Sequence, residues 1–447
     1  MSKKIVILGG GISGYGSAIL AKKEGFEVFL SDMGAIDPKY KARLDEWGVP
    51  YEEGGHTEER ILQADEVIKS PGIPDKAPIV KALAKKGVPV ISEIEFAGRY
   101  TAAKTICITG SNGKTTTTTL AYQILRDAGF NVGLGGNIGE SFAYQVATES
   151  FDWYVLELSS FQLDGMRDFR ADVAVLMNIT PDHLDRYNHS MELYAASKMG
   201  ITRNQGLDDS FIFCADDPVT QKMLTESEPR LHRRLPFTVK SRPVQGARLE
   251  DGVIRAKVGG KTLKIDTAKM HIRGIHNIYN AMAAGLAAMA AGVKPESISR
   301  TVESFEGVEH RLQRVGEIDG VEYVNDSKAT NVDAVWYALE SVTKPVVWIA
   351  GGTDKGNDYE PLYEFVPKIK ALVCMGVNNE KLVKAFRGRV DEVHSTATLD
   401  DAMARARKLA RPGDVVLLSP ACASFDLFDN YEHRGRMFAQ WVDKNKS

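Results

Sequence analysis

The sequence predicts an α/β protein of three domains, each built on an open and largely parallel sheet. Short apolar runs typical of buried strands recur throughout the 447 residues, and most of them lead into a loop rich in glycine or polar residues. Helical patterns separate successive runs, as expected for parallel strands joined by crossover helices. The length fits roughly two to four domains.

Composition narrows the classes of function. Hydrophobic residues make up 43% of the chain and charged residues 26%, which is typical of globular proteins, and the net charge of −3 gives no indication of nucleic-acid binding. Four scattered cysteines without the spacing of a zinc site predict reduced thiols, and therefore a cytoplasmic location. No apolar segment approaches the length of a transmembrane helix, so we expect no membrane insertion.

Residues 1–98 predict a Rossmann-like first domain. An apolar strand at 4–8 leads into the pattern G-x-G-x-x-G, a helix through 17–23 and a second strand that ends beside Asp32. The three glycines are Gly9, Gly11 and Gly14. In this βαβ context they allow a diphosphate to approach the backbone, and Asp32 suits a ribose diol or a ring N–H. The alternative is a plain tight turn.

Two further strands belong to this domain. The run 67–73 is a strand that ends in a loop at Ser70, where a ligand can lie at the carboxyl edge of the sheet. The run 88–93 predicts the last strand, and the domain boundary is expected near Gly98.

Residues 99–307 predict a central P-loop-type mononucleotide-binding domain with a parallel sheet. Its first strand ends in a glycine-containing turn, followed by a lysine and a row of threonines that open a helix. This loop consists of Gly110, Ser111, Asn112, Gly113, Lys114, Thr115 and Thr116. Its backbone N–H groups can surround a triphosphate, Lys114 can reach the β- and γ-phosphates, and the Thr115 hydroxyl can ligate Mg²⁺. Because Ile108 replaces the usual first glycine, the loop is a shortened variant. The alternative is a Gly/Asn turn with a threonine-rich helix cap.

Further ionisable residues follow strands of this central domain. Glu157 ends an apolar strand, and His183 follows the next one. Because the carboxyl ends of parallel strands meet at one edge of a sheet, we expect Thr115, Glu157 and His183 to converge. Metal binding is the preferred interpretation of Glu157, with helix capping as the alternative. For His183 the two alternatives are a metal ligand and a structural histidine.

Two predicted helices of the central domain carry polar residues of interest. The helix 190–202 contains Lys198, which periodicity alone places on a solvated face. A later alanine-rich helix carries Asn277 and Asn280 at i and i+3, where they can address a single ligand. Helix capping is the alternative for Asn277.

Residues 308–447 predict a C-terminal Rossmann-like α/β domain. Its four apolar strands end in loops of glycine, serine and other polar residues, as in an open sheet with ligand loops at one edge. Lys328 and Lys355 lie in two of these loops and suit an anionic substrate, although either position is also typical of a surface lysine.

The motifs together resemble those of the Mur ligase family of ATP-dependent, amide-bond-forming enzymes, over essentially the whole chain. They are Thr109–Thr116, Glu157–Ser160, His276–Asn277, Glu309–Arg311 and Asn325–Asn331. Within the family, the Rossmann-like first domain, Ser70–Ile73 and Ser419–Asp426 are similar to the member that adds D-glutamate to UDP-N-acetylmuramoyl-L-alanine. The Asp-Asn-Pro-Arg signature of the diaminopimelate- or lysine-adding member is absent.

The resemblance implies a reaction and its cofactors. ATP phosphorylates the substrate carboxylate to an acyl phosphate, the amine attacks, and a tetrahedral intermediate expels phosphate. The resemblance implies two Mg²⁺ ions, one held by Thr115 and Glu157 and the other by His183 and a carbamylated Lys198. The residues it implies for the nucleotide are the loop 110–116, with Lys114 on the phosphates, and Asn277, Arg311 and Asp326.

The resemblance also implies sites for the two other small-molecule substrates. The UDP part is expected at Gly11, Ser13, Gly14, Asp32, Ser70 and Gly72, with Asn137 and His183 nearer the muramoyl end. The D-glutamate carboxylates are expected near Lys328, Thr330, Lys355, Ser424 and Phe425. The implied protein is a monomeric cytoplasmic enzyme of peptidoglycan precursor synthesis.

The sequence leaves three rival functions to compare with this one. A nicotinamide-dependent oxidoreductase would use the glycine pattern and Asp32, but it leaves the ATP loop and the cluster at Asp326 and Lys328 without a role. A non-catalytic nucleotide switch does not explain lysines in the ligand loops of a third domain. Within the family, the alternative is the L-alanine-adding ligase, which also has a Rossmann-like first domain.

Overall fold

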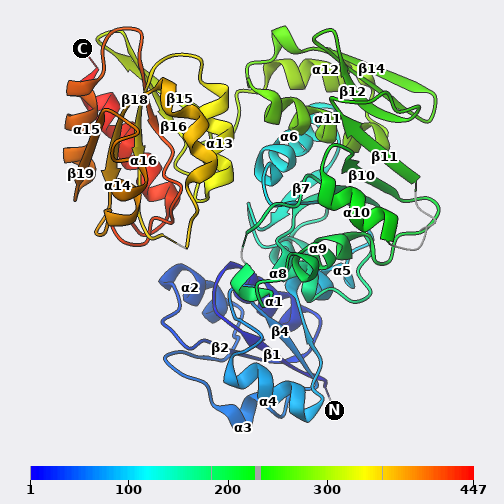
Figure 1. Ribbon diagram of the computed structural model, residues 1–447. Coiled ribbons are helices and arrows are strands. Elements are labelled where there is room, and N and C mark those ends of the chain that lie inside the picture. The colour runs from blue at the N-terminus through cyan, green and yellow to red at the C-terminus, as the bar shows by residue number, and fades with distance from the viewer. Residues whose placement is uncertain (1, 183, 227–232, 355, 447) are drawn as a thin grey trace. The chain divides into compact units, whose positions relative to one another are not determined.

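The computed structural model describes residues 2–182, 184–226, 233–354 and 356–446 (Figure 1). Within these ranges the strands form three sheets, of five, nine and six strands in chain order. The described residues group into two compact units: residues 1–270 with 278–304, and residues 271–277 with 305–447. The first two sheets belong to the first unit and the third sheet to the second unit. The predicted α/β class, with a mostly parallel sheet in each part, is confirmed.

The first sheet is parallel throughout, in the order β3-β2-β1-β4-β5. Its strands are β1 (Lys4–Leu8), β2 (Glu27–Ser31), β3 (Tyr51–Glu52), β4 (Glu66–Lys69) and β5 (Val90–Ile91). Its helices are α1 (Ile12–Lys23), α2 (Pro38–Glu46), α3 (Glu58–Ile61), α4 (Pro78–Lys86) and α5 (Glu93–Gly98). The strand order reverses between β1 and β4, which is where open α/β sheets bind ligands. Ser70, after β4, lies at this point, because its N–H donates to Leu8 O at 2.9 Å.

Two element boundaries in the first domain differ from the prediction. Helix α1 begins at Ile12, inside the glycine pattern, and not at residue 17. The run 88–93 was expected to be a strand, but only Val90–Ile91 pairs, and Glu93 already starts α5. The physical reason is Ser92, whose hydroxyl accepts the Glu95 N–H at 3.3 Å and caps the helix.

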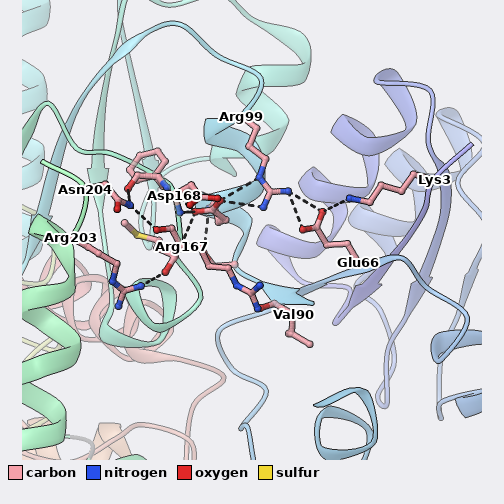
Figure 2. Close-up of polar contacts among 12 residues, drawn as sticks. Lys3, Glu66, Val90, Arg99, Arg167, Asp168, Arg203 and Asn204 are labelled. Atoms are coloured by element: carbon pink, nitrogen blue, oxygen red, sulfur yellow. Dashed lines mark hydrogen bonds and ion pairs between the residues drawn. The ribbon is translucent and has the colours of Figure 1, made fainter. Parts of the chain in front are cut away.

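A buried carboxylate joins the first sheet to the central domain within the same unit (Figure 2). Glu95 Oε2 accepts the backbone N–H groups of residues 167–169 at 2.9–3.0 Å. Its other oxygen accepts two bonds from Arg99, whose remaining Nη1 pairs with Glu66 on β4 at 2.9 Å. The side chain of Glu95 is only 1% exposed, so this joint is shielded from water.

The second sheet has the order β14-β13-β12-β11-β10-β9-β6-β8-β7, and its strands from β7 to β12 in this order are parallel. Its strands are β6 (Lys104–Thr109), β7 (Val132–Gly136), β8 (Trp153–Glu157), β9 (Val173–Leu176), β10 (Ser210–Cys214), β11 (Arg233–Thr238), β12 (Gly246–Glu250), β13 (Val253–Val258) and β14 (Lys261–Asp266). The last three pair antiparallel with each other. The order reverses at β6, so the loops after β6, β8 and β9 meet at one edge.

Helices and short 3₁₀ turns surround this second sheet (Figure 1). They are α6 (Lys114–Asp127), α7 (Phe142–Thr148), α8 (Ser160–Asp164), η1 (Leu184–Arg186), α9 (Met191–Met199), η2 (Gly200–Thr202), α10 (Pro218–Glu226), η3 (Thr267–Lys269), α11 (Ile275–Ala290) and α12 (Pro295–Ser304). Buried side chains of α1, α5 and α7 form one continuous core with strands β6 and β8. The core therefore runs from the first sheet into the second.

The third sheet has the order β15-β16-β20-β17-β18-β19, with only the β15–β16 pair antiparallel. Its strands are β15 (Gln313–Ile318), β16 (Val321–Asn325), β17 (Val346–Ala350), β18 (Ile369–Met375), β19 (Glu392–Thr396) and β20 (Val415–Leu418). Its helices are α13 (Val332–Ser341), η4 (Glu360–Lys368), α14 (Glu380–Phe386), α15 (Leu399–Leu409) and α16 (Tyr431–Asn445). Helices α13, η4 and α14 pack on one face, and α15 and α16 on the other.

All four cysteines are buried free thiols. Burial raises the pKa of Cys107, Cys214 and Cys374 to about 12, and it also raises the pKa of Cys422. In the described parts of the chain, no helix has the length and apolar character needed to cross a membrane.

Candidate active site

The glycine pattern after β1 forms a turn whose shape requires two of its glycines. Gly9 has a φ of 93°, in the left-handed region. A Cβ atom at Gly14 would lie 1.8 Å from the carbonyl oxygen of Gly9, so only glycine lets α1 start this close to the turn. A Cβ at Gly11 would meet no atom within 4 Å, which leaves room beside this residue for a ligand.

Two polar residues predicted for this site already have protein partners. Asp32 accepts the Gly10 N–H at 2.5 Å and the Gly34 N–H at 2.7 Å, so its carboxylate holds the turn in shape. Ser13 is buried, and its backbone oxygen accepts the Ser17 hydroxyl at 2.7 Å. Gly72 is exposed at the same edge of the sheet, after β4.

The loop after β6 has the geometry of a phosphate-binding turn. Gly113 has a φ of 83° and occupies the N-cap of α6, so the free N–H groups of the first helical turn follow it directly. The ammonium group of Lys114 folds back over the loop and donates to the carbonyls of Gly110 and Ser111 at 2.7 and 2.9 Å. Thr115 and Thr116 are buried in the first turn, and within the described ranges the Thr116 hydroxyl has no hydrogen-bond partner.

Asn178 holds this loop, and the sequence analysis missed it. Its side-chain oxygen accepts the Asn112 N–H at 2.9 Å, its amide nitrogen donates to Asn112 O at 3.1 Å, and its backbone oxygen accepts the Ser111 N–H at 2.9 Å. The available signal was its position directly after the apolar run that forms β9, beside the loop after β6.

Lys198 contradicts the expectation of a solvated face. Its side chain is among the largest fully buried ones in the protein, and its ammonium group donates to Gly110 O at 2.8 Å. Burial lowers its pKa well below the usual value, and the neighbouring charge of Lys114 lowers it further. The signal was available in the sequence, because Lys198 shares the buried side of α9 with Tyr194 and Ala195, at i−4 and i−3.

Glu157 lies at the same edge, opposite Ile108 in the pairing of β8 with β6. It is 1% exposed, and its Oε1 accepts the Asn137 side-chain N–H at 2.8 Å. Its Oε2 is buried and has no hydrogen-bond partner among the residues that the structure describes. A buried carboxylate oxygen without a partner is costly unless a cation or a donor satisfies it, which fits a divalent metal ion. A capping role for Glu157 is contradicted, because Ser159 caps α8.

The residues predicted on the alanine-rich helix have different partners. Asn277 donates its side-chain N–H to Arg273 O at 2.8 Å, whereas Asn280 accepts a bond from the Thr117 hydroxyl at 3.2 Å. His276 is half-buried, and loss of hydration together with the charge of Arg311 lowers its pKa to about 4.

The third sheet carries a second polar cluster where its strand order reverses at β20. Asp326, directly after β16, is fully buried and accepts bonds from the Ser419 hydroxyl at 2.7 Å and the Leu312 N–H at 3.2 Å. Burial raises its pKa to about 7, although the charge of Arg311 lowers it. Arg434 was also missed: it lies buried on α16 and donates to the backbone oxygens of Ser327 and Cys422.

The same edge bears the residues predicted for an amino-acid substrate. The Lys328 ammonium lies 5.1 Å from the centre of the Tyr431 ring, and Ser424 is buried. Phe425, in contrast, is 74% exposed. Two further residues predicted for the active site, His183 and Lys355, lie outside the described residues.

Strained backbone marks this edge. His310, Leu312 and Ala421 have φ values of 63°, 46° and 60°, a region that residues other than glycine rarely adopt. Each such residue costs on the order of 1 kcal/mol or more, and such strain is concentrated at functional sites.

Comparison with known proteins agrees with this geometry. Residues 4–79 match the MurD N-terminal domain, residues 108–288 the Mur ligase middle domain, and residues 310–422 the Mur ligase glutamate ligase domain. The chain belongs to the Mur ligase family. It therefore has the three Mur ligase domains, each with its own sheet.

Two full-length relatives of this Mur ligase carry the same enzyme name. The UDP-N-acetylmuramoylalanine–D-glutamate ligase of Bacteroides fragilis is 53% identical over 98% of this chain and 99% of its own length. The enzyme of the same name from Christiangramia forsetii is 51% identical over 99% of both chains.

Solved structures share the Mur ligase fold at low sequence identity. The pseudomurein peptide ligase type C of Methanothermus fervidus superimposes with a TM-score of 0.63 at 20% identity, over 99% of this chain and all of that one. The UDP-N-acetylmuramate–alanine ligase of Thermotoga maritima gives 0.63 at 19% identity with the same coverage.

Proposed function

We propose that this Mur ligase joins D-glutamate to UDP-N-acetylmuramoyl-L-alanine, with conversion of ATP to ADP and phosphate. Family membership makes the chain an ATP-dependent ligase that forms an amide bond. The observation that carries the substrate assignment is the 53% identity to a D-glutamate ligase across the whole chain, including all three domains. The reaction is a step of cytoplasmic peptidoglycan precursor synthesis.

The proposed nucleotide contacts come from the loop after β6 and from three further residues. We assign the phosphates to Gly110, Ser111, Asn112, Gly113, Lys114, Thr115 and Thr116. The remaining nucleotide contacts are assigned to Asn277, Arg311 and Asp326. Support comes from the left-handed Gly113 at the start of α6 and from the position of the Lys114 ammonium over the loop. Lys114 is suited to balance the charge that develops on the transferred phosphoryl group.

Mg²⁺ fits this edge, because Glu157 Oε2 is a buried carboxylate oxygen to which no residue in the described part of the chain donates a hydrogen bond. Thr115 and Glu157 would hold one ion, and His183 with a carbamylated Lys198 the other. Mg²⁺ would supply screening between the anionic reactants. The lowered pKa of Lys198 supports carbamylation, because a neutral amine is the form that captures CO₂.

The sites for the UDP substrate and for D-glutamate are assigned to further loops of the three domains. The UDP part is assigned to Gly11, Ser13, Gly14, Asp32, Ser70 and Gly72, and the muramoyl end to Asn137 and His183. D-glutamate is assigned to Lys328, Thr330, Lys355, Ser424 and Phe425. The carboxylate of UDP-N-acetylmuramoyl-L-alanine attacks the γ-phosphorus, and the amine of D-glutamate then displaces phosphate from the acyl phosphate. Cationic lysines at a glutamate site hold the two carboxylates of the incoming substrate.

The remaining assignments concern organisation. We place the domain boundaries at residues 98/99 and 307/308, so that each domain keeps its own sheet. We expect a monomer in the cytoplasm, with small-molecule substrates only, no nucleic acid and no insertion into a membrane.

Mass spectrometry of the reaction tests the proposal. The enzyme is supplied with ATP, Mg²⁺, UDP-N-acetylmuramoyl-L-alanine and single amino acids. The expected product is heavier by one glutamate residue and forms with the D isomer only. Product from UDP-N-acetylmuramate and L-alanine would instead assign the preceding step. Oxidation of NAD(P)H, or nucleotide turnover without any amide product, would contradict a ligase.

A further inference from the structure

The loop between β7 and α7 links the first domain to the nucleotide site. Its first residue, Asn137, bonds Glu157 twice: the backbone N–H donates to Glu157 O, and the side chain donates to Oε1, both at 2.8 Å. The side-chain bond holds the Glu157 carboxylate, and the backbone bond fixes the start of the loop beside β8. The orientation of Glu157 therefore depends on where this short loop, residues 137–140, is held.

The other end of the loop is held by the first domain. Glu140 Oε1 accepts the hydroxyl of Tyr15, which is fully buried on α1. Glu140 Oε2 accepts Arg43 Nη1 of α2 at 3.0 Å, and Arg43 also donates to the Tyr15 hydroxyl. Burial raises the pKa of Glu140, but bonds from Tyr15, Ser141 and Arg43 outweigh this effect and lower it, so the carboxylate is ionised at neutral pH.

Tyr15 directly follows the last glycine of the pattern that we assign to UDP. It belongs to the first turn of α1, so a movement of the glycine turn displaces its hydroxyl. Helix α1 also touches the loop closely, because a Cβ at Gly16 would lie 1.9 Å from Ser141 Oγ. The arginine stacks over both Tyr15 and Tyr144, with its guanidinium carbon 5.0 and 4.6 Å from the ring centres.

The cluster of Tyr15, Arg43 and Glu140 is expected to contribute little to the free energy of unfolding. The side chains of Arg43 and Glu140 are 37% and 34% exposed, and ion pairs with that access to water contribute about 0–1 kcal/mol. The first domain already has a better shielded joint to the central domain at Glu95 and Arg99 (Figure 2).

We propose that Tyr15, Arg43 and Glu140 are positioning residues that couple occupancy of the UDP-sugar site to the orientation of Glu157 in the nucleotide site. The UDP-sugar steadies α1, α1 and Arg43 hold Glu140, and the short loop carries this restraint to Asn137 and Glu157. This inference rests on the proposed function. It assigns to the first domain a role in preparing the nucleotide site, in addition to holding its own ligand.

Thermodynamic linkage tests the proposal without relying on turnover. Isothermal titration calorimetry measures the Kd of UDP-N-acetylmuramoyl-L-alanine alone and in the presence of Mg²⁺ with a non-hydrolysable ATP analogue. In the wild-type enzyme we expect the affinity to rise about 5- to 150-fold, and the ATP analogue to gain by the same factor from the sugar nucleotide.

The variants separate coupling from binding and folding. In Tyr15→Phe and Glu140→Gln the coupling factor is expected to fall close to 1, while each ligand alone still binds. Arg43→Met keeps an apolar side chain beside the two tyrosine rings and removes the charge, and its coupling factor is also expected to fall close to 1. This variant keeps the test decisive if either of the other two folds poorly. Glu66→Gln is the matched control, because it removes a carboxylate from the Arg99 joint and leaves the loop untouched.

Each outcome has a distinct meaning. Lost coupling in the three variants, with coupling retained in Glu66→Gln, supports the positioning role. Full coupling in the variants overturns it, as does a wild-type enzyme that binds both ligands independently. A wild-type enzyme that does not bind UDP-N-acetylmuramoyl-L-alanine at all overturns the proposed function itself.

Discussion

Lys198 is a cationic residue by type, but its surroundings shift its protonation equilibrium toward the neutral amine. Its ammonium form has lost its hydration shell and faces a second cation, Lys114, so the pKa falls. Replacing it by alanine removes the proposed carbamate, and with it several kcal/mol of charge stabilisation in the transition state. We expect kcat to fall by about 100-fold or more in a steady-state assay of phosphate release.

Chemical rescue distinguishes a lost ligand from a lost packing contact. A small carboxylic acid added to Lys198→Ala is expected to restore part of the activity, because it returns an anionic oxygen to the vacated space. Ala196, exposed on the opposite side of α9, offers a control position, since Ala196→Ser should leave kcat unchanged. An active Lys198→Ala enzyme without added acid would contradict the carbamate.

At the scale of elements, helix α1 can begin close to the turn after β1 only because Gly14 has no side chain. Gly14→Ala would force a methyl group to within 1.8 Å of Gly9 O, so the helix must move away from the sheet. We expect a loss of about 1–3 kcal/mol in the free energy of unfolding, seen as a lower Tm, and weak binding of the UDP substrate.

Gly11→Ala is the matched variant within the same turn. Its added Cβ meets no protein atom within 4 Å, so Tm should stay close to that of the wild type. If Gly11 lies against the diphosphate, this variant still binds the UDP substrate more weakly in calorimetry. Equal losses of Tm in both variants would contradict the close-contact argument.

Sequence patterns predicted a strand and the loop after it well where the whole signal lies within one short segment. The short run before Thr109 and Gly110, with the lysine that follows, predicts a phosphate-binding loop without any other part of the chain, and the structure has the expected strand, turn and helix there. Asn137 was reached only through the family resemblance, and the contacts of Asn178 and Arg434 could not be predicted, because they depend on which strands and helices become neighbours in the fold. Strand order depends on long-range packing, which local periodicity does not encode.

The burial of Lys198 illustrates the same limit on a helix. The spacing of Lys198 from Tyr194 and Ala195 could be seen in the sequence. A lysine beside apolar residues usually lies at the edge of the buried face of a helix, so we predicted that Lys198 is exposed. Only the packing of α9 beside the phosphate-binding loop shows that this lysine is enclosed. Ser92 shows the same limit, because it lay inside the predicted strand 88–93 but caps α5 in the structure. The residue types that cap helices also occur where strands end, so the sequence alone does not separate the two.

At the scale of the whole molecule, the joint at Glu95 ties the first domain to the central one and depends on pH. Burial raises the pKa of Glu95, but three backbone N–H bonds and Arg99 outweigh it, so the pKa lies below its usual value of 4.5. The folded protein therefore binds fewer protons than the unfolded chain near this pH. Its contribution to stability is complete above about pH 4.5 and is lost as the pH falls through the lowered pKa.

Glu95→Gln tests this joint by thermal denaturation between pH 7 and pH 3. The variant should have a lower Tm at pH 7, because breaking a buried charge pair costs about 3–5 kcal/mol, and the difference from wild type should shrink toward pH 3. Glu59→Gln, at an exposed carboxylate of α3, serves as the control and should track the wild type at every pH. A Tm difference that does not change with pH would mean that the charge of Glu95 is unimportant.

The four enclosed cysteines give the protein a practical property. Their thiols remain protonated at neutral pH and are screened from solvent, so maleimide or nitroxide reagents have no reactive native target in the folded state. A cysteine placed on the surface of the C-terminal sheet and another on the first sheet would accept such labels alone. Spin or fluorescence measurements can then test whether ligands change the distance between the two labels, in a protein that keeps its natural thiols.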